Sequence, residues 1–117
     1  AVILPGGMPG TLNLERSAKV NAFVDYAYEN QKLVCAICAA PSILGHKGML
    51  KGKKAVCFPG FESELEGAEL SDSFVVTDGN IITAKGMGSA VKFGIAIGAA
   101  FVGEAKMKKI EESLQCS

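Results

Sequence analysis

The strongest constraint on the fold is a short apolar run that stops at a cysteine. Residues 33–37 are continuously apolar, and the chain continues with Cys38, Ala39, Ala40 and Pro41. A run of five residues is too short for a helix and suits a buried parallel strand, whereas proline is tolerated in the first turn of a helix. The sequence therefore predicts a strand that turns into a helix at Cys38.

Further runs complete an alternation of strands and helices. The predicted elements are a buried strand at 1–4, a glycine-rich loop at 5–10, an amphipathic helix from Ser17, a strand at 54–58, a β-hairpin at 74–77 and 81–84, a buried apolar helix from Ser89 to Val102, and a final amphipathic helix at 104–114. Alternation of this kind predicts an α/β fold. We expect a doubly wound, mostly parallel sheet with helices on both faces and the hairpin as an addition.

Composition favours one globular domain without a charged binding surface. Twelve Lys and Arg balance twelve Asp and Glu among the 117 residues, and 49% of the residues are hydrophobic. Bulk charge therefore predicts neither nucleic acid nor an anionic membrane as a partner. The apolar stretch 93–102 is shorter than the roughly 20 residues that cross a bilayer. Four cysteines are few for a disulfide-stapled domain, which favours the cytoplasm.

Cys38 is the predicted chemical centre. A thiol attacks as its thiolate, and the N–H groups at a helix start stabilise that anion. The amide of Ala39 would point towards the sulfur or a bound oxyanion, and those of Gly6 and Gly7 would complete the cradle if the first two strands are neighbours. Taken alone, the same pattern also fits a buried core thiol.

The other candidate side chains have structural interpretations. Cys35 and Cys38 form a Cys-x-x-Cys pair, but strand alternation turns their side chains to opposite faces and no second ligand pair exists, so we expect no metal site. Cys57 is interpreted as buried filler in its strand. His46 is the only histidine and lies eight residues after Cys38, about 12 Å along a helix, so we expect it to interact with the last helix carbonyls. Met87 and Gly88 are expected to line the cysteine pocket.

Three segments together resemble the DJ-1 (ThiJ-like) branch of the DJ-1/PfpI superfamily. They are Ile-Leu-Pro-Gly-Gly at 3–7, Ala-Ile-Cys-Ala-Ala-Pro at 36–41 and Thr-Ala-Lys-Gly-Met-Gly-Ser at 83–89. The resemblance covers nearly the whole chain. It implies a flavodoxin-like fold, similar to class I glutamine amidotransferases, and a single domain at 1–117 that contains only the C-terminal portion of the family domain.

The resemblance also implies roles for particular residues. Cys38 would be the reactive residue, the amides of Ala39, Gly6 and Gly7 would form an oxyanion pocket, and a buried glutamate from an earlier element would hydrogen-bond the sulfur. We expect that glutamate to come from an N-terminal segment that this chain lacks. Ala39 stands where the protease-like branch has histidine, which argues against a peptidase. Phe58 stands where several relatives have histidine and would form an aromatic wall.

Two functions are therefore expected, and both use Cys38. The first is a cysteine-dependent enzyme of the glyoxalase or deglycase type, a lyase or hydrolase that acts on small reactive carbonyl compounds. The second is a redox-sensing stress-response protein or chaperone, in which an oxidant converts Cys38 to a sulfinic acid without turnover. A structural relative with an idle pocket is a third possibility. The resemblance implies a homodimer, and we expect no cofactor.

Overall fold

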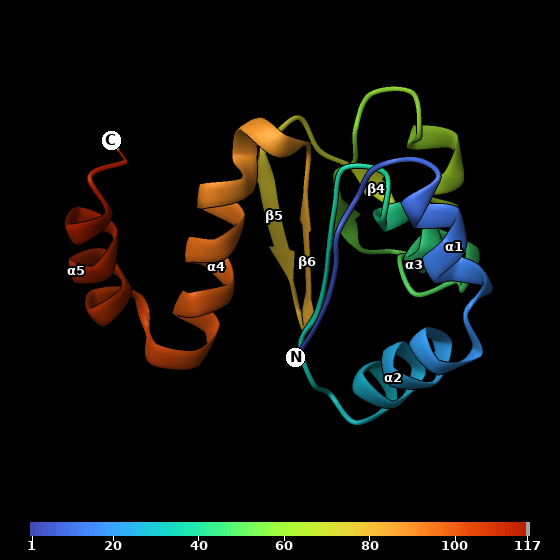
Figure 1. Ribbon diagram of the computed structural model, residues 1–117, viewed down its shortest axis with the longest axis horizontal. Helices are drawn as coiled ribbons and strands as arrows, with labels where there is room; N and C mark the ends of the chain where they lie inside the picture. Colours follow the sequence, from blue (N-terminus) through green and yellow to red (C-terminus); the bar gives the residue numbers. More distant parts are fainter. Residues whose placement is uncertain (117) are drawn as a thin grey trace.

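Strand β2 (Val34–Ile37) lies in the centre of a four-stranded sheet in the computed structural model, which describes residues 1–116 (Figure 1). The strand order is β1-β2-β6-β5, with β1 at Val2–Leu4, β6 at Ile81–Ala84 and β5 at Val75–Asp78. Strand β2 pairs in parallel with β1 and β6, and β5 pairs antiparallel with β6. The sheet is thus mostly parallel with a hairpin at one edge, as predicted.

Helices cover both faces of this sheet (Figure 1). Helices α1 (Gly10–Arg16), α2 (Ala18–Glu29) and α3 (Pro41–His46) lie on one side, and α4 (Ala90–Val102) lies on the other with α5 (Glu104–Leu114) outside it. Helix α2 begins where the sequence predicts, and Ser17 caps it, because its hydroxyl accepts a hydrogen bond from the Val20 amide at 3.3 Å. Within residues 1–116, no helix combines the length and apolar character needed to span a membrane.

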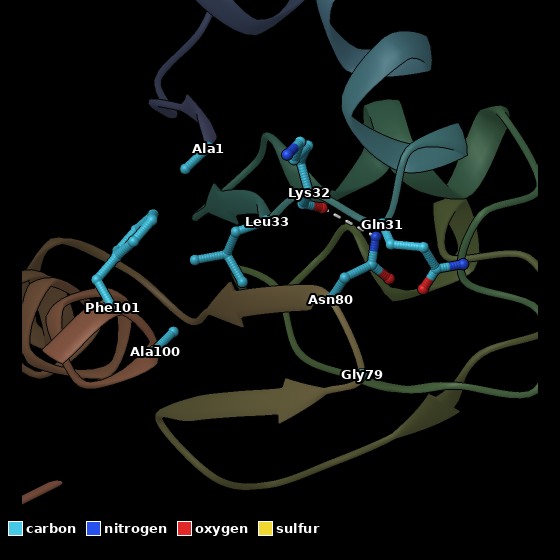
Figure 2. A pocket seen from close by; sticks show the side chains of 8 residues that line it. All are labelled: Ala1, Gln31, Lys32, Leu33, Gly79, Asn80, Ala100 and Phe101. Carbon is cyan, nitrogen blue, oxygen red and sulfur yellow. Dashed lines mark hydrogen bonds between the residues drawn. The ribbon is translucent and has the colours of Figure 1, made fainter. Parts of the chain in front are cut away.

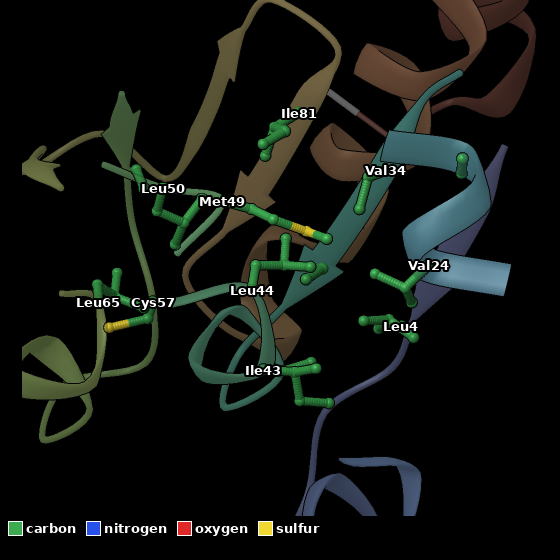
Figure 3. Close-up of a cluster of buried hydrophobic side chains, with 14 residues drawn as sticks. Leu4, Val24, Val34, Ile43, Leu44, Met49, Leu50, Cys57, Leu65 and Ile81 are labelled. Carbon is green, nitrogen blue, oxygen red and sulfur yellow. The ribbon is translucent and has the colours of Figure 1, made fainter. Parts of the chain in front are cut away.

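The two faces of the sheet bury separate hydrophobic clusters. One contains Leu4, Val34 and Ile81 from the strands, packed against α2 and α3 (Figure 3). The other contains Cys35 and Ile82, packed against Phe93 of α4. Because side chains alternate along β2, Cys35 points away from the first cluster and is fully buried in the second. The prediction that Cys35 belongs to the core is confirmed.

The predicted strand at 54–58 is wrong in extent. Only β3 (Lys54–Ala55) is a strand, and it pairs with β4 (Glu69–Leu70) in a separate two-stranded parallel sheet. The next residues bond instead to β6 and to the residue that follows β2. The Val56 amide donates to the Thr83 hydroxyl at 3.1 Å, and the Phe58 amide donates to the Cys38 carbonyl at 2.8 Å. Cys57 is therefore buried, as predicted, but it lies outside any strand.

Two elements are less buried than their apolar sequences predict. In β1 only Leu4 is buried, and Ile3 is 51% exposed. In α4 only Phe93 is buried, whereas Phe101 is 65% exposed. Helix α4 packs on β2, β5 and β6, so the end strand β1 lies beyond it. The sheet and α5 cover only part of the surface of α4, and its remaining apolar side chains face outward.

Candidate functional site

Cys38 sits on a sharp bend directly after β2. Its φ is +66°, in the left-handed region that side chains other than glycine rarely adopt, at a cost of about 1–2 kcal/mol. The bend is fixed from both sides: the Cys38 amide donates to the Ala84 carbonyl at 2.9 Å, and the Cys38 carbonyl accepts from the Phe58 amide at 2.8 Å. A strained cysteine between a strand and a helix is the geometry of a nucleophile elbow. Its side chain is half-buried.

The helix after the bend begins at Pro41, later than the start at Cys38 that the sequence predicts. Residues 38–40 form a turn, and α3 starts at Pro41 and spans six residues. The Ala40 amide donates to the Ile37 carbonyl at 3.1 Å, and the Ser42 hydroxyl donates to the Ala39 carbonyl at 2.7 Å. Of the three amides in the turn, those of Cys38 and Ala40 donate to the Ala84 and Ile37 carbonyls, which leaves the Ala39 amide without a bonded acceptor within residues 1–116.

Gly6 lies directly against the Cys38 bend. A Cβ atom built on Gly6 would meet the Cys38 Cβ at 2.6 Å and the Ile37 carbonyl oxygen at 2.8 Å. Parallel pairing of β1 with β2 produces this contact. The predicted approach of Gly6 to Cys38 depends on these two strands being neighbours, and they are. Within residues 1–116, the amides of Gly6, Gly7 and Ala39 donate no hydrogen bond to another residue. Gly6 thus lies against both the Cys38 side chain and the Ala39 amide nitrogen.

The close approach of Gly6 gives a first prediction. Gly6→Ala is expected to destabilise the fold by about 1–3 kcal/mol, because the added methyl group meets main-chain atoms that cannot rotate away. It should also slow the reaction of Cys38 with iodoacetamide, since the bend must shift. Chemical denaturation and mass spectrometry of the labelled thiol measure the two effects. Gly10→Ala is the control, because a Cβ on Gly10 meets nothing within 4 Å; equal behaviour of both variants would contradict the prediction.

The three predicted pocket residues line one depression next to the bend. Phe58, Met87 and Gly88 lie around a space of about 290 Å³ together with Pro59, Phe74, Lys85, Gly86 and Ser89. Cys38 is not among the residues that line it. Ser89 fixes the rim, because its hydroxyl accepts from the Gly86 amide at 3.1 Å and donates to the Gly86 carbonyl at 2.8 Å. Sequence reasoning missed Phe74 and Lys85, although Lys85 precedes the glycine-rich segment that it singled out.

A wider depression of about 500 Å³ lies at the amino-terminal ends of the parallel strands, away from Cys38 (Figure 2). Its lining includes Leu33 before β2, Asn80 before β6 and Phe101 of α4, and the Asn80 amide group donates to the Lys32 carbonyl at 3.0 Å. Leu33 and Asn80 directly precede parallel strands, whereas open α/β sheets bind ligands beyond the carboxyl ends of their strands. We therefore place the candidate site at the carboxyl ends of the parallel strands, around Cys38.

The other thiols occupy different environments. Burial raises the pKa of Cys35 to about 11. Burial also raises the pKa of Cys57 to about 11, with smaller contributions from Glu62 and Cys38. Both groups remain protonated at neutral pH and are poor nucleophiles. Cys116 is exposed near the end of the chain. Cys38 alone among these thiols combines partial access with a strained position between a strand and a helix.

His46 lies at the end of α3 but has other partners than the sequence analysis expects. Its Nδ1 contacts the Glu15 carboxylate at 2.5 Å, and its Nε2 contacts the Glu64 carboxylate at 2.9 Å. The expected contact with the last helix carbonyls is wrong, because α1 and the 3-10 helix η1 (Glu62–Glu64) bring two acidic side chains to the ring. Hydrogen bonds to Glu64 and then Glu15 raise the pKa of His46.

This pair of contacts predicts a pH-dependent contribution to stability. A raised folded-state pKa means that protonation stabilises the fold below the ordinary value of 6.5 and that the contribution disappears as pH rises through the folded value. The melting temperature of His46→Gln should therefore lie furthest below that of the unsubstituted protein at about pH 6 and approach it by about pH 9. Because the ring is 43% exposed, the effect should be modest. A constant difference across this range would contradict the assignment.

The fold and the bend at Cys38 define an open α/β protein with a strained cysteine between a strand and a helix. Comparison with known proteins agrees: the DJ-1/PfpI family matches residues 1–100. Protein dj-1beta of Drosophila melanogaster is 32% identical over 115 residues, which cover 97% of this chain and 62% of that protein. A deglycase from Pyrococcus horikoshii is 33% identical over 88 residues, covering 73% of this chain and 52% of the deglycase. The chain belongs to the DJ-1/PfpI family.

Solved structures agree with this assignment. A mutant of a DJ-1 superfamily protein from Salmonella typhimurium superimposes with a TM-score of 0.89 at 35% identity, over 97% of this chain and 62% of that one. The oxidized DJ-1 of Toxoplasma gondii superimposes with a TM-score of 0.87 at 32% identity, over 93% of this chain and 60% of that one. The chain thus spans about three fifths of the length of these relatives.

Proposed function

We propose that Cys38 is the nucleophile of a glyoxalase- or deglycase-type enzyme that acts on small reactive carbonyl compounds. One observation carries this proposal: the thiol sits on a strained bend in contact with Gly6, and the amides of Gly6, Gly7 and Ala39 have no hydrogen-bond partner within residues 1–116. Amides in such positions stabilise the negative oxygen that forms when a nucleophile adds to a carbonyl. The similarity to a deglycase from Pyrococcus horikoshii supports the same chemistry.

The reaction follows from the chemistry of a 2-oxoaldehyde. The Cys38 thiolate adds to the aldehyde carbon, and the carbonyl electron pair becomes an alkoxide held by the three amides. Protonation gives a hemithioacetal. Transfer of a proton from the former aldehyde carbon to the neighbouring carbon, with protonation of the keto oxygen and loss of the hemithioacetal hydroxyl proton, gives the thioester of a 2-hydroxy acid. Water then attacks the thioester, releasing the 2-hydroxy carboxylate and the thiolate.

The proton transfer in this reaction requires an acid–base group close to Cys38. His46 binds Glu15 and Glu64 beyond the far end of α3, and the family resemblance implies that Phe58 replaces a histidine found in several relatives. The family resemblance implies a glutamate from an N-terminal element for this role. We therefore place the proton shuttle in that element and assign Cys38 and the three amides to the addition step.

The test is product formation by the intact protein. Incubation with methylglyoxal should yield lactate at a rate proportional to protein concentration, and prior alkylation with iodoacetamide should abolish the reaction. Lactate is measured enzymatically or by NMR, and mass spectrometry verifies that Cys38 carries the label. Undiminished turnover after complete labelling of Cys38 would refute the proposal.

A redox role is the second candidate, because the same amides would stabilise a sulfinate on Cys38. The oxidized state of the similar Toxoplasma gondii DJ-1 favours it, as does the burial of Cys35 and Cys57. Treatment with mild peroxide should then add two oxygen atoms to Cys38 before any other thiol. Oxidation of Cys116 with Cys38 still reduced would exclude the redox role without affecting the enzymatic one.

A further inference from the structure

The depression beside Cys38 has an apolar wall and a cationic edge. Phe58 and Phe74, which form part of the wall, are 44% and 57% exposed. Lys85 lines the same space, and its ammonium group lies 5.6 Å from the centre of the Phe74 ring. Lys92, in the first turn of α4, lines a different depression, but its ammonium group lies 5.3 Å from the same ring centre. Two positive charges thus flank one exposed aromatic ring.

Neither of these two lysines forms an ion pair within residues 1–116. The ion pairs found within residues 1–116 are His46 with Glu15 and Glu64, and Lys47 with Asp25. Glu62 and Asp72 share a neighbouring depression with Lys85, and Glu104 and Glu111 share one with Lys92, but none of the four forms an ion pair with these lysines within residues 1–116. Backbone amides and then the charge of Lys85 lower the pKa of Glu62, so Lys85 and Glu62 interact only at longer range than an ion pair. The positive charge therefore remains available to an anion from solution, next to aromatic surface that would favour an apolar ligand body.

Hydrogen bonds connect this space to the Cys38 bend. The Phe58 amide donates to the Cys38 carbonyl, and the Cys38 amide donates to Ala84, the residue before Lys85. The Lys85 amide in turn donates to the Phe74 carbonyl at 2.9 Å. Gly86 packs on Phe58, since a Cβ atom on Gly86 would lie 3.3 Å from the Phe58 ring. The wall and the cationic edge are thus built on the residues that hold the bend.

We propose that this depression is a specificity subsite that binds the substituent of the carbonyl substrate. The substituent it fits has an aromatic or extended apolar body and ends in an anionic group, which Lys85 and Lys92 bind. This inference rests on the proposed function, because it takes Cys38 as the atom that attacks the carbonyl. It narrows the substrate class from carbonyl compounds in general to those that carry such a substituent.

The test compares two matched substrates of the intact protein, phenylglyoxal and 4-carboxyphenylglyoxal. Lys85→Met should lower the ratio of kcat/KM for the carboxylated over the neutral substrate about fivefold, the size expected for one partly exposed ion pair. The double variant with Lys92→Met should lower it further, and Lys85→Arg should retain it. Lys106→Met is the control, because this exposed lysine of α5 lies outside the depression. A ratio that Lys85→Met leaves unchanged would overturn the proposal.

A binding measurement separates the subsite from the reaction. Benzoate and benzyl alcohol are titrated into the Cys38→Ser protein, and NMR shifts of residues 85–89 report occupancy. Benzoate should shift these signals at lower concentration than benzyl alcohol, and Lys85→Met should remove the difference. If no carbonyl compound turns over but benzoate still binds in this way, the proposed reaction fails and the anion subsite stands. Equal binding of the two probes would remove the subsite even if turnover is found.

Discussion

Replacing Cys38 with serine is expected to lower kcat/KM for methylglyoxal at least about a thousandfold, the scale seen when a covalent nucleophile is removed. Serine preserves the size and the bend, so the loss would come from the nucleophile. A hydroxyl group is far less acidic than a thiol, and no base within residues 1–116 contacts this position to activate it. Steady-state lactate formation by the intact protein measures the effect.

The matched control for this prediction is Cys116→Ser. Cys116 is the exposed thiol, and its sulfur donates a hydrogen bond to the Glu111 carbonyl oxygen at 3.8 Å. This variant should retain the full rate, and its melting temperature should not change. Equal loss of activity in both variants would contradict the prediction, because replacing a cysteine anywhere in the protein would then be enough to lower the rate.

Gly45→Ala is expected to produce the largest loss of stability, about 3 kcal/mol or more. A Cβ atom on Gly45 would lie 2.1 Å from the Glu64 carbonyl oxygen and 2.9 Å from the Leu65 Cα, and both are main-chain atoms. Helix α3 would have to separate from η1, which would also pull His46 from Glu64. The higher helix propensity of alanine offsets only about 1 kcal/mol of this. Thermal melting should show a decrease of more than about 10 °C.

Gly94→Ala provides the control for Gly45→Ala. Gly94 also lies within a helix, α4, but a Cβ atom there meets nothing within 4 Å. Alanine should therefore raise stability by up to about 1 kcal/mol through helix propensity alone. If both variants shift the melting temperature in the same direction, the close packing of α3 on η1 is not what makes Gly45 necessary.

The sequence predicts the parts of this fold that depend on local patterns. The apolar run at 33–37, the turn Asp78-Gly79-Asn80 and Ser17 before an amphipathic stretch each specify an element with few alternatives. These elements are present as β2, the β5–β6 hairpin and α2. Elements whose partners are remote in sequence are predicted less well. The strand at 54–58 breaks at Val56 because Thr83 and Cys38 offer hydrogen bonds that the local sequence does not reveal.

The sequence likewise predicts some features of the candidate site and not others. The approach of Gly6 to Cys38 follows from two parallel strands that end at the same edge, so the residue types alone point to it. The positive φ of Cys38 and the later start of α3 depend on the packing of three segments and are not visible in the sequence. The contacts of His46 with Glu15 and Glu64 join residues that are 31 and 18 positions away, which spacing along α3 could not indicate.

The most direct test of the account is the alkylation rate of each thiol in the intact protein. Iodoacetamide is added at neutral pH, and mass spectrometry follows labelling of the four cysteines with time. We predict that Cys38 is labelled first, ahead of the exposed Cys116, while Cys35 and Cys57 remain protected by burial. Labelling of Cys116 while Cys38 stays as unreactive as Cys35 would contradict the central claim that the bend holds a reactive thiol.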